Sequence, residues 1–182
     1  LIGGINYLAS QGMNSVYFLT YNIDGGDGQD TWPWTAPNIR SRFDVSKLAQ
    51  WEIAFQHMTN RGLQLHIVTQ ETENDSALGT GGVSLIRALY YRELVARFGH
   101  HLAIQWNVGE ENNNSTADKL AFAQYIRDLD PYDHPIVVHS YLNDIPGYYD
   151  ELFGVAPYDA SSIQGYGTFY NEWAILLREL SA

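Results

Sequence analysis

The sequence has 182 residues, of which 45% are hydrophobic, so it is long enough to form one domain with a substantial core. Its formal net charge of −11 repels phosphate backbones and anionic lipid surfaces, which argues against nucleic acid and membrane partners. The absence of cysteine excludes disulfides, thiol nucleophiles and thiolate metal sites. No apolar run is long enough to span a bilayer.

The first residues predict a helix rather than a targeting segment. Ile2, Ile5 and Leu8 recur at helical spacing, and Gly12 is a typical residue at a helix end. The sequence has neither an initiator methionine nor a signal-peptide pattern. We therefore expect residues 1–182 to be a single partial domain, truncated at both ends relative to a longer protein.

A strand is predicted over residues 14–20, where β-branched and aromatic residues are concentrated. Residues 21–38 then form a long polar loop, and a loop of this length in a compact domain is usually functional. Its stretch 24–30 has spaced carboxylates that would suit calcium, but it lacks the EF-hand spacing, so a flexible acidic loop is preferred. Asp44 is suited to cap a helix that ends at Gly62.

The rest of the chain alternates between strands and helices. Further strands are predicted over residues 63–69, 102–108, 135–140 and 161–166. Helices are predicted after the glycine-rich turn 79–82, from a capping box at Ser115 to Pro131, over 148–153 and over 170–180. Apolar strands alternating with amphipathic helices are typical of βαβ units with a parallel sheet.

This pattern predicts an α/β fold, and we expect a partial (β/α)8 TIM barrel. The alternative, an open doubly wound sheet, would bind a nucleotide at a glycine-rich turn directly after a strand. The glycines at 79–82 lie well past their strand, and the acidic loop 24–30 would repel a phosphate. The barrel is therefore the preferred reading.

The central predicted strand ends in a concentration of polar groups. Its core residues are followed by Gly109, which allows the backbone to turn, and then by Glu110, Glu111 and three asparagines. Side chains held at the carboxyl end of a rigid strand are how α/β proteins usually present chemistry. We expect this tip to carry the functional site.

The segment Trp106-Asn107-Val108-Gly109-Glu110-Glu111-Asn112 resembles the fourth-strand motif of clan A glycoside hydrolases. In that clan a glutamate at the end of the fourth strand is the general acid/base, and asparagine usually precedes it. Trp106, Gly109 and Glu111 match the pattern, whereas Glu110 replaces the asparagine. The wider context resembles a narrower group of bacterial glycoside hydrolases, in residues 12–20, 68–75, 91–101 and 129–139.

The resemblance implies an eightfold barrel of which this chain supplies strands two to six. It also implies a retaining mechanism with two carboxylates about 5–5.5 Å apart. The nucleophilic glutamate of clan A ends the seventh strand, so we expect it beyond this chain, in the remainder of its own barrel. Glu111 is the expected acid/base and Glu110 the alternative, because adjacent side chains of an extended strand point to opposite faces.

Ten residues are predicted to bind or position the carbohydrate substrate. Most end a strand at the same edge of the sheet, and Trp32 and Trp34 offer aromatic faces on either side of a proline. For these two tryptophans a hydrophobic plug over the barrel is the alternative. The ten residues are Asn112, Asn107, Gln70, Glu71, His139, Tyr141, Trp32, Trp34, Tyr21 and Tyr166.

Two other functions remain open from the residues alone. The replacement at Glu110 and the expected lack of a seventh strand are compatible with a non-catalytic carbohydrate-binding barrel. A metal-dependent hydrolase would draw on histidines, but no His-x-His or His-Glu-x-x-His spacing occurs. We therefore expect no metal ion and no cofactor, and we expect His66, in the middle of a strand, to be structural.

Overall fold

The structure, a computed structural model, describes residues 1–26, 29–142, 145–167 and 169–180. Four parallel strands form one sheet, and their order in the sheet is their order along the chain. The strands are β1 (Ser15–Leu19), β2 (Gln64–Val68), β3 (Ile104–Asn107) and β4 (Ile136–Val137). The register places Tyr17 beside His66, and His66 beside Gln105.

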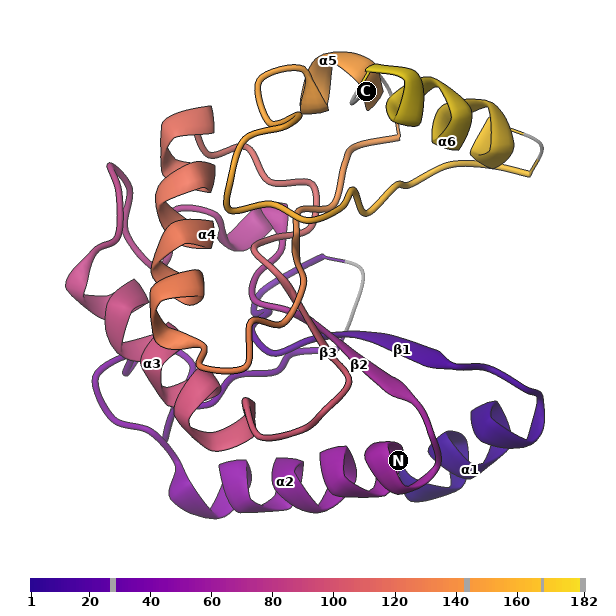
Figure 1. The fold of residues 1–182 in the computed structure, drawn as a ribbon. Coiled ribbons are helices and arrows are strands. Elements are labelled where there is room, and N and C mark those ends of the chain that lie inside the picture. The colour runs from indigo at the N-terminus through magenta and orange to yellow at the C-terminus, as the bar shows by residue number, and fades with distance from the viewer. Residues whose placement is uncertain (27–28, 143–144, 168, 181–182) are drawn as a thin grey trace.

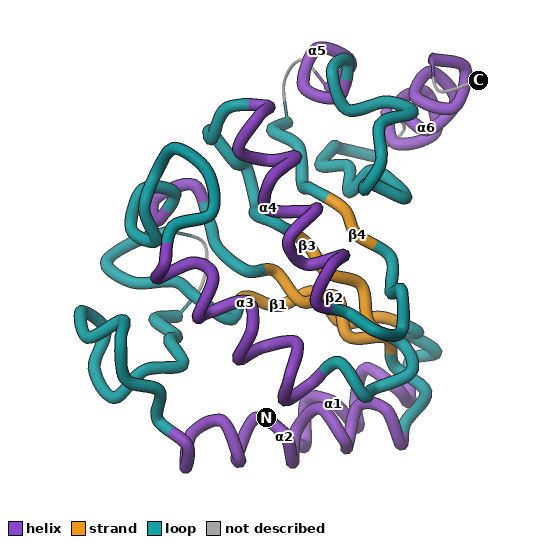
Figure 2. Tube along the Cα trace, turned by 60° about the vertical axis from the view of Figure 1, so that its left-hand side comes forward, coloured by secondary structure: helices purple, strands orange, loops and turns teal. Residues whose placement is uncertain are grey.

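The helices between successive strands cover one face of the sheet, and the two helices after β4 pack on each other away from it (Figures 1 and 2). Among the described residues, no helix is long and apolar enough to cross a membrane. The helices are α1 (Ile2–Ser10), α2 (Val45–Asn60), α3 (Leu85–Phe98), α4 (Thr116–Leu129), α5 (Ile145–Tyr149) and α6 (Phe169–Leu180), with a 3-10 turn η1 (Thr72–Asn74). This repeated strand–helix unit is the building block of a barrel.

Local capping chemistry determines where two of these helices begin, as the sequence predicts. The Asp44 carboxylate accepts a hydrogen bond from the backbone N–H of Lys47 at 3.0 Å. The Ser115 hydroxyl accepts one from the backbone N–H of Asp118 at 3.2 Å. Each cap satisfies an N–H that has no partner within its helix, which contributes about 1 kcal/mol.

The two faces of the sheet differ in chemistry. The face toward the helices carries the fully buried Ile67 and Trp106, which join a core cluster of aliphatic and aromatic side chains. The opposite face carries Tyr17, His66 and Gln105 side by side. In a closed barrel this second face, which we call the inner face, lines the interior. The structure thus directs polar side chains toward the barrel axis.

Two sequence predictions differ from the structure at the ends of strands. Leu102 is 85% exposed and lies outside β3, which begins only at Ile104. The strand predicted over residues 161–166 is reduced to an isolated bridge between Ser162 and His139. The backbone N–H of Ser140 donates to the Ser162 carbonyl at 3.0 Å, but the N–H of Gln164 donates to the Ser140 hydroxyl at 3.2 Å instead of to a backbone carbonyl.

The helix predicted over residues 148–153 is also displaced. It begins at Ile145 and ends at Tyr149 as α5, and a turn follows it. A carbonyl of Tyr149 accepts from the N–H groups of both Leu152 and Phe153, at 2.8 and 3.1 Å. The last turn is therefore tightened rather than continued as a helix.

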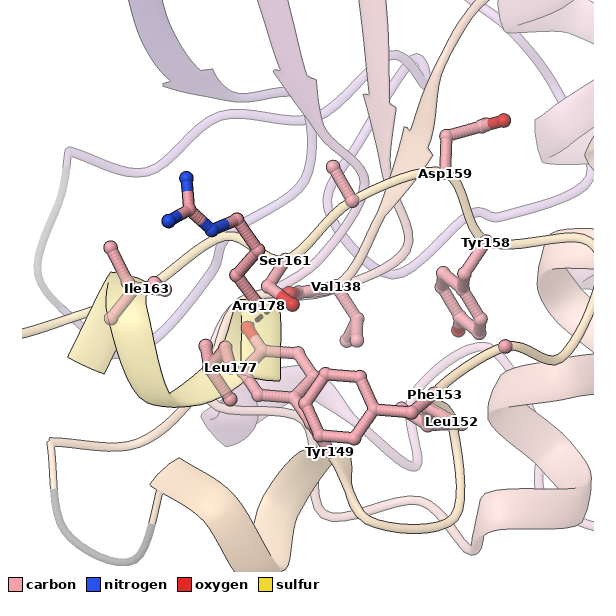
Figure 3. A pocket seen from close by; sticks show the side chains of 13 residues that line it. Val138, Tyr149, Leu152, Phe153, Tyr158, Asp159, Ser161, Ile163, Leu177 and Arg178 are labelled. Carbon is pink, nitrogen blue, oxygen red and sulfur yellow. Dashed lines mark hydrogen bonds between the residues drawn. The ribbon is translucent and has the colours of Figure 1, made fainter. Parts of the chain in front are cut away.

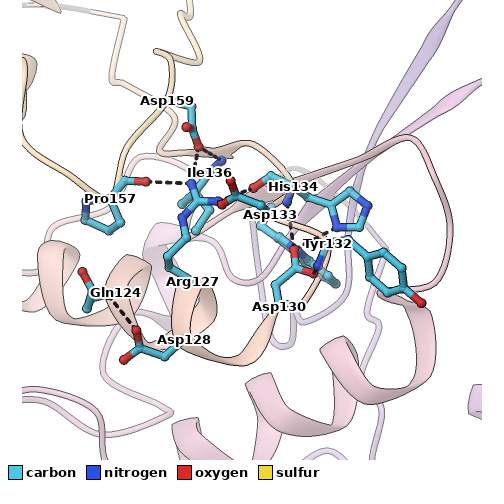
Figure 4. Close-up of polar contacts among 11 residues, drawn as sticks. Gln124, Arg127, Asp128, Asp130, Tyr132, Asp133, His134, Ile136, Pro157 and Asp159 are labelled. Carbon is cyan, nitrogen blue, oxygen red and sulfur yellow. Dashed lines mark hydrogen bonds and ion pairs between the residues drawn. The ribbon is translucent and has the colours of Figure 1, made fainter.

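A buried aspartate ties β3 to the connection that leads into β4 (Figure 4). The Asp130 carboxylate accepts from the indole N–H of Trp106 at 2.9 Å and contacts Nδ1 of His134 at 2.8 Å. Beside it, Arg127 forms ion pairs with Asp133 and Asp159. These polar contacts hold the amino end of β4 in place.

Candidate functional site

The carboxyl ends of the strands meet at one edge of the sheet, which we call the rim: residues 20–22, 69–71, 108–112 and 139–141. The backbone ladder continues past the strands here. The N–H of Glu110 donates to the Gln70 carbonyl at 2.9 Å, and the N–H of His139 donates to the Gly109 carbonyl at 3.1 Å. The tip after β3 is therefore fixed to both neighbouring strands.

Glu111 ends this ladder because its φ is +46°, in the left-handed region. The alternation of side chains expected for an extended strand does not apply between Glu110 and Glu111. The extended backbone predicted from the sequence at Glu110 and Glu111 is therefore wrong. The turn removes the argument that only one of the two carboxylates reaches the barrel mouth.

The charges of three carboxylates act on one phenol on the inner face. Tyr17 hydrogen-bonds to the Glu110 side chain. Its pKa is raised above the usual value, first by burial and then by the nearby charges of Glu110, Glu71 and Glu111. Glu110 and Glu111 follow β3, and Glu71 follows β2, so these charges come from the carboxyl ends of two neighbouring strands.

Tyr17 is not among the site residues predicted from the sequence. The available signal was the alternation within the strand, since Tyr17 is a polar-tipped residue on the face opposite Phe18. The same signal, a polar residue at alternate positions of an apolar strand, marks His66 and Gln105.

The inner face also holds a neutral histidine pair. The backbone N–H of Gly109 donates to Oδ1 of Asn107 at 3.1 Å. The other end of this side-chain amide, Nδ2, therefore faces Nε2 of His66, at 3.0 Å. Nε2 of His66 therefore accepts. Burial lowers the pKa of His66 and of His139 to about 4. His139 also contacts the Ser162 hydroxyl through Nδ1 at 2.8 Å.

We expect stability to fall as the pH is lowered from about 6.5 to about 4. In this window the unfolded chain protonates His66 and His139 while the folded chain does not, so acid favours unfolding. The expected loss is roughly 1–3 kcal/mol for each histidine. Urea denaturation at several pH values would measure it. Replacing His66 with asparagine should reduce the pH dependence in this window, and an unchanged slope would contradict the assignment.

Several predicted sugar-binding amides are engaged inside the protein. Asn112 is 1% exposed, and its amide group donates to the Val108 carbonyl at 3.1 Å. Gln70 is fully buried, donates to Asp75 at 2.8 Å and accepts from Arg87. These contacts hold the turn after β3 and the segment after β2, so Asn112 and Gln70 are placed to position the rim.

We expect Gly109→Ala to disturb this turn. Gly109 has φ +153°, and an added Cβ would lie 2.6 Å from Nδ2 of Asn112. Strain of this kind costs about 1–3 kcal/mol. Thermal melting of the variant would measure the loss, with Gly12→Ala as the control for a positive φ without crowding, since an added Cβ there meets nothing within 4 Å. Equal melting temperatures for the two variants would contradict the proposed crowding at Gly109.

The loop after β1 folds back as a packed cover. Trp34 and Tyr21 are both fully buried, with their rings edge to face at 5.0 Å. Trp34 also packs against Tyr90 of α3, at 5.5 Å between ring centroids, so its ring belongs to the core. Trp32 is only half buried, and the ammonium group of Lys47 lies 4.5 Å from its ring centroid.

The same loop reaches the rim at Gly26. A Cβ added at Gly26 would lie 2.1 Å from Oε2 of Glu71, so the loop backbone covers this carboxylate directly. Glu71 is accordingly 3% exposed. Residues 27 and 28 of the acidic stretch, and Asn143 after β4, lie outside the described residues.

The other two predicted tyrosines, Tyr141 and Tyr166, lie in different surroundings. Tyr141 contacts the Thr72 hydroxyl through its own hydroxyl at 2.8 Å, and the charge of Glu111 contributes to its raised pKa, of which burial is the larger cause. Tyr166 is 70% exposed in the segment before α6. The described contacts thus bring Tyr141 to the rim and give no such contact for Tyr166.

A separate cavity of about 310 Å³ lies between β4, α5 and α6 (Figure 3). Its walls are mainly apolar and include Val138, Leu152, Phe153 and Leu177. None of the predicted site residues lines it. The rim, rather than this cavity, is the candidate functional site.

Comparison with solved structures identifies the fold. A protein from Bacteroides vulgatus ATCC 8482, named as a candidate glycoside hydrolase, superposes with a TM-score of 0.76 at 14% identity over 97% of this chain and 38% of its own. A glycoside hydrolase family 5 enzyme from Prevotella bryantii B14 gives 0.61 at 12% identity, over 99% of this chain and 60% of its own. This chain has the barrel fold of glycoside hydrolases.

A further structure with this glycoside hydrolase barrel fold is a family 5 protein from Bacteroides vulgatus, with a TM-score of 0.60 at 17% identity over 78% of this chain and 31% of that one. The predicted α/β partial barrel is therefore confirmed. The chain spans 38% of the length of the first of these proteins. No family model and no curated protein matches the sequence.

Proposed function

We propose that this chain is part of a glycoside hydrolase that cleaves O-glycosidic bonds of a polysaccharide or oligosaccharide with retention of configuration. The observation that carries the proposal is the set of carboxylates at the rim, where the charges of Glu110, Glu111 and Glu71 all act on Tyr17. The barrel fold supports it, since related barrels are named as glycoside hydrolases. One protein of this fold, an endoglucanase from Pseudomonas stutzeri, was solved with cellobiose.

In the proposed mechanism Glu111 protonates the leaving oxygen and later deprotonates the attacking water. A hydrogen bond from Tyr17 favours the carboxylate form of Glu110, and this makes Glu110 the poorer proton donor. Glu111 directly follows Glu110 along the chain, and a neighbouring negative charge favours the protonated form that a general acid needs. The nucleophilic carboxylate would come from a barrel strand outside these 182 residues.

The remaining rim residues, together with Trp32 in the loop after β1, would hold the sugar and exclude water. Tyr141, His139 and Trp32 keep partly exposed side chains that are suited to hydroxyl contact or ring stacking. The neutral imidazole of His139 can donate or accept a hydrogen bond without competing for the proton of the acid/base. The buried amides of Gln70, Asn107 and Asn112 would act by positioning these groups.

The stereochemistry of the first product tests the proposal. The complete protein would be supplied with a panel of β-linked and α-linked glycans, and the anomeric configuration of the new reducing end followed by NMR before mutarotation. We expect hydrolysis with retention. Inversion would exclude the two-step mechanism, and a single-displacement reaction would then be indicated.

A non-catalytic carbohydrate-binding barrel is the second candidate. The observation that favours it is the replacement at Glu110, where the matching motif has asparagine. Measurable affinity for a glycan, without hydrolysis of any member of the panel, would support this candidate over the first.

A further inference from the structure

A cluster of side chains that could ligate a metal ion lies away from the rim, near the amino end of β3. Glu52 belongs to α2, and His100 and His101 directly follow α3. One ligand atom from each of the three residues lies within 4.8 Å of the others. The fold therefore brings a carboxylate of α2 to two consecutive histidines that are distant from it along the chain.

Nε2 of His101 lies within hydrogen-bond distance of Glu52, and the distances from both histidines to this carboxylate also suit a shared ion. Nε2 of His100 lies 3.3 Å from Oε1 of Glu52, and Nε2 of His101 lies 3.3 Å from Oε2. Zinc takes nitrogen and oxygen ligands at about 2.0–2.2 Å, so two ligands of a tetrahedral ion are about 3.3 Å apart. A direct N–H···O bond is usually near 2.9 Å.

The surroundings prepare His101 to act as a ligand. Its side chain is 1% exposed, and its Nδ1 contacts the Thr59 hydroxyl at 3.0 Å, which orients Nε2 toward Glu52. Such an outer contact on the second ring nitrogen is typical of metal-bound histidines.

The outer side of the cluster is open. The side chains of His100 and Glu52 are 50% and 36% exposed, so an ion has a path of entry and room for a water ligand. Imidazole with a single carboxylate suits zinc and its first-row neighbours, whereas magnesium and calcium prefer all-oxygen sites.

We propose that Glu52, His100 and His101 form a binding site for a divalent transition metal ion, with Zn²⁺ as the preferred ion. The ion would join α2 to the segment between α3 and β3. Because the site is at the amino end of the strands, it serves stability rather than the chemistry of the rim. No spacing along the sequence indicates it, since the fold supplies the third ligand.

Metal titration of the complete protein tests the site independently of any glycosidase activity. After removal of metal with a chelator, Zn²⁺ should bind with one equivalent at this cluster by calorimetry and raise the melting temperature by about 5 °C at saturation, whereas Mg²⁺ should not. Co²⁺ should give the intense visible absorption of a tetrahedral site.

Variants assign the effect to these residues. His100→Ala and Glu52→Gln alter partly exposed side chains, and each should weaken Zn²⁺ binding at least tenfold and abolish the cobalt absorption. His57→Ala is the matched control, because His57 lies on the same helix but bonds to Asn6. His66→Ala controls for binding at the inner-face histidines. Absence of a zinc-dependent shift, or a shift that survives both His100→Ala and Glu52→Gln, would overturn the proposal.

Discussion

Replacing Glu111 with glutamine in the complete protein is expected to lower turnover of an unactivated glycan by about 10²–10⁴-fold. Glutamine keeps the size and polarity of the side chain but cannot deliver or accept the proton. Substrate affinity should change little, because the amide preserves hydrogen bonding in the bound state. The measurement is kcat and KM for the variant and the unaltered protein on the same glycan.

The leaving group separates this role from a merely structural one. An aryl glycoside with a highly acidic phenol needs no proton on its leaving oxygen, so the first chemical step of Glu111→Gln should recover with such a substrate. Azide, a nucleophile that needs no general base, should then speed the second step and yield a glycosyl azide. A structural defect would slow all substrates alike and would not respond to azide.

Two further glutamates are the controls. Glu73→Gln alters an exposed carboxylate of η1 near the rim and should leave kcat within about twofold. Glu110→Gln should slow turnover without the recovery that azide gives. If Glu110→Gln shows azide rescue and Glu111→Gln does not, the roles of the two carboxylates are exchanged.

Replacing Arg87 with methionine is expected to lower the free energy of unfolding by about 3–5 kcal/mol. Arg87 has no exposed surface, and its guanidinium donates to the Gln70 side chain, to the Tyr91 hydroxyl and to the carbonyls of Asp75 and Gly79. Methionine would fill similar space but leave those acceptors buried without a donor. Urea denaturation of the complete protein measures the loss.

The same substitution should also loosen the rim. Gln70, which Arg87 holds, bonds to Asp75, and Asp75 in turn accepts from the backbone N–H of Asn113 at 2.7 Å. We therefore expect faster amide exchange at residues 110–114 in Arg87→Met. Arg92→Met is the matched control, because Arg92 is exposed on the same helix, and its stability should change by less than about 0.5 kcal/mol. Similar losses for Arg87→Met and Arg92→Met would contradict the role given to the buried guanidinium.

Elements governed by local chemistry were predictable from the sequence. Asp44 and Ser115 begin α2 and α4 as expected, because a capping side chain acts on an N–H only three residues away. The parallel sheet also followed from the alternation of apolar strands with amphipathic helices. The carboxylate-rich tip after β3 was recognisable because the change from apolar to polar residues is abrupt at Gly109.

Features that depend on distant partners were not predictable. The left-handed turn at Glu111 is invisible in a sequence that reads as extended. The burial of Trp34 depends on its packing against Tyr21 and Tyr90. Glu52 and His101 are 49 positions apart, so only the packing of α2 beside the end of α3 brings them together.

The order of the strands bears on how the chain folds as it is made. Neighbouring strands are joined by contacts between residues 49 positions apart, as for Ser15 and Gln64, or 39 positions apart, as for His66 and Gln105. Each new strand therefore finds its neighbour already synthesised. As the ribosome releases the chain, the strands can pair one after another in the order β1 to β4, and each new strand adds to the edge formed by the strand before it.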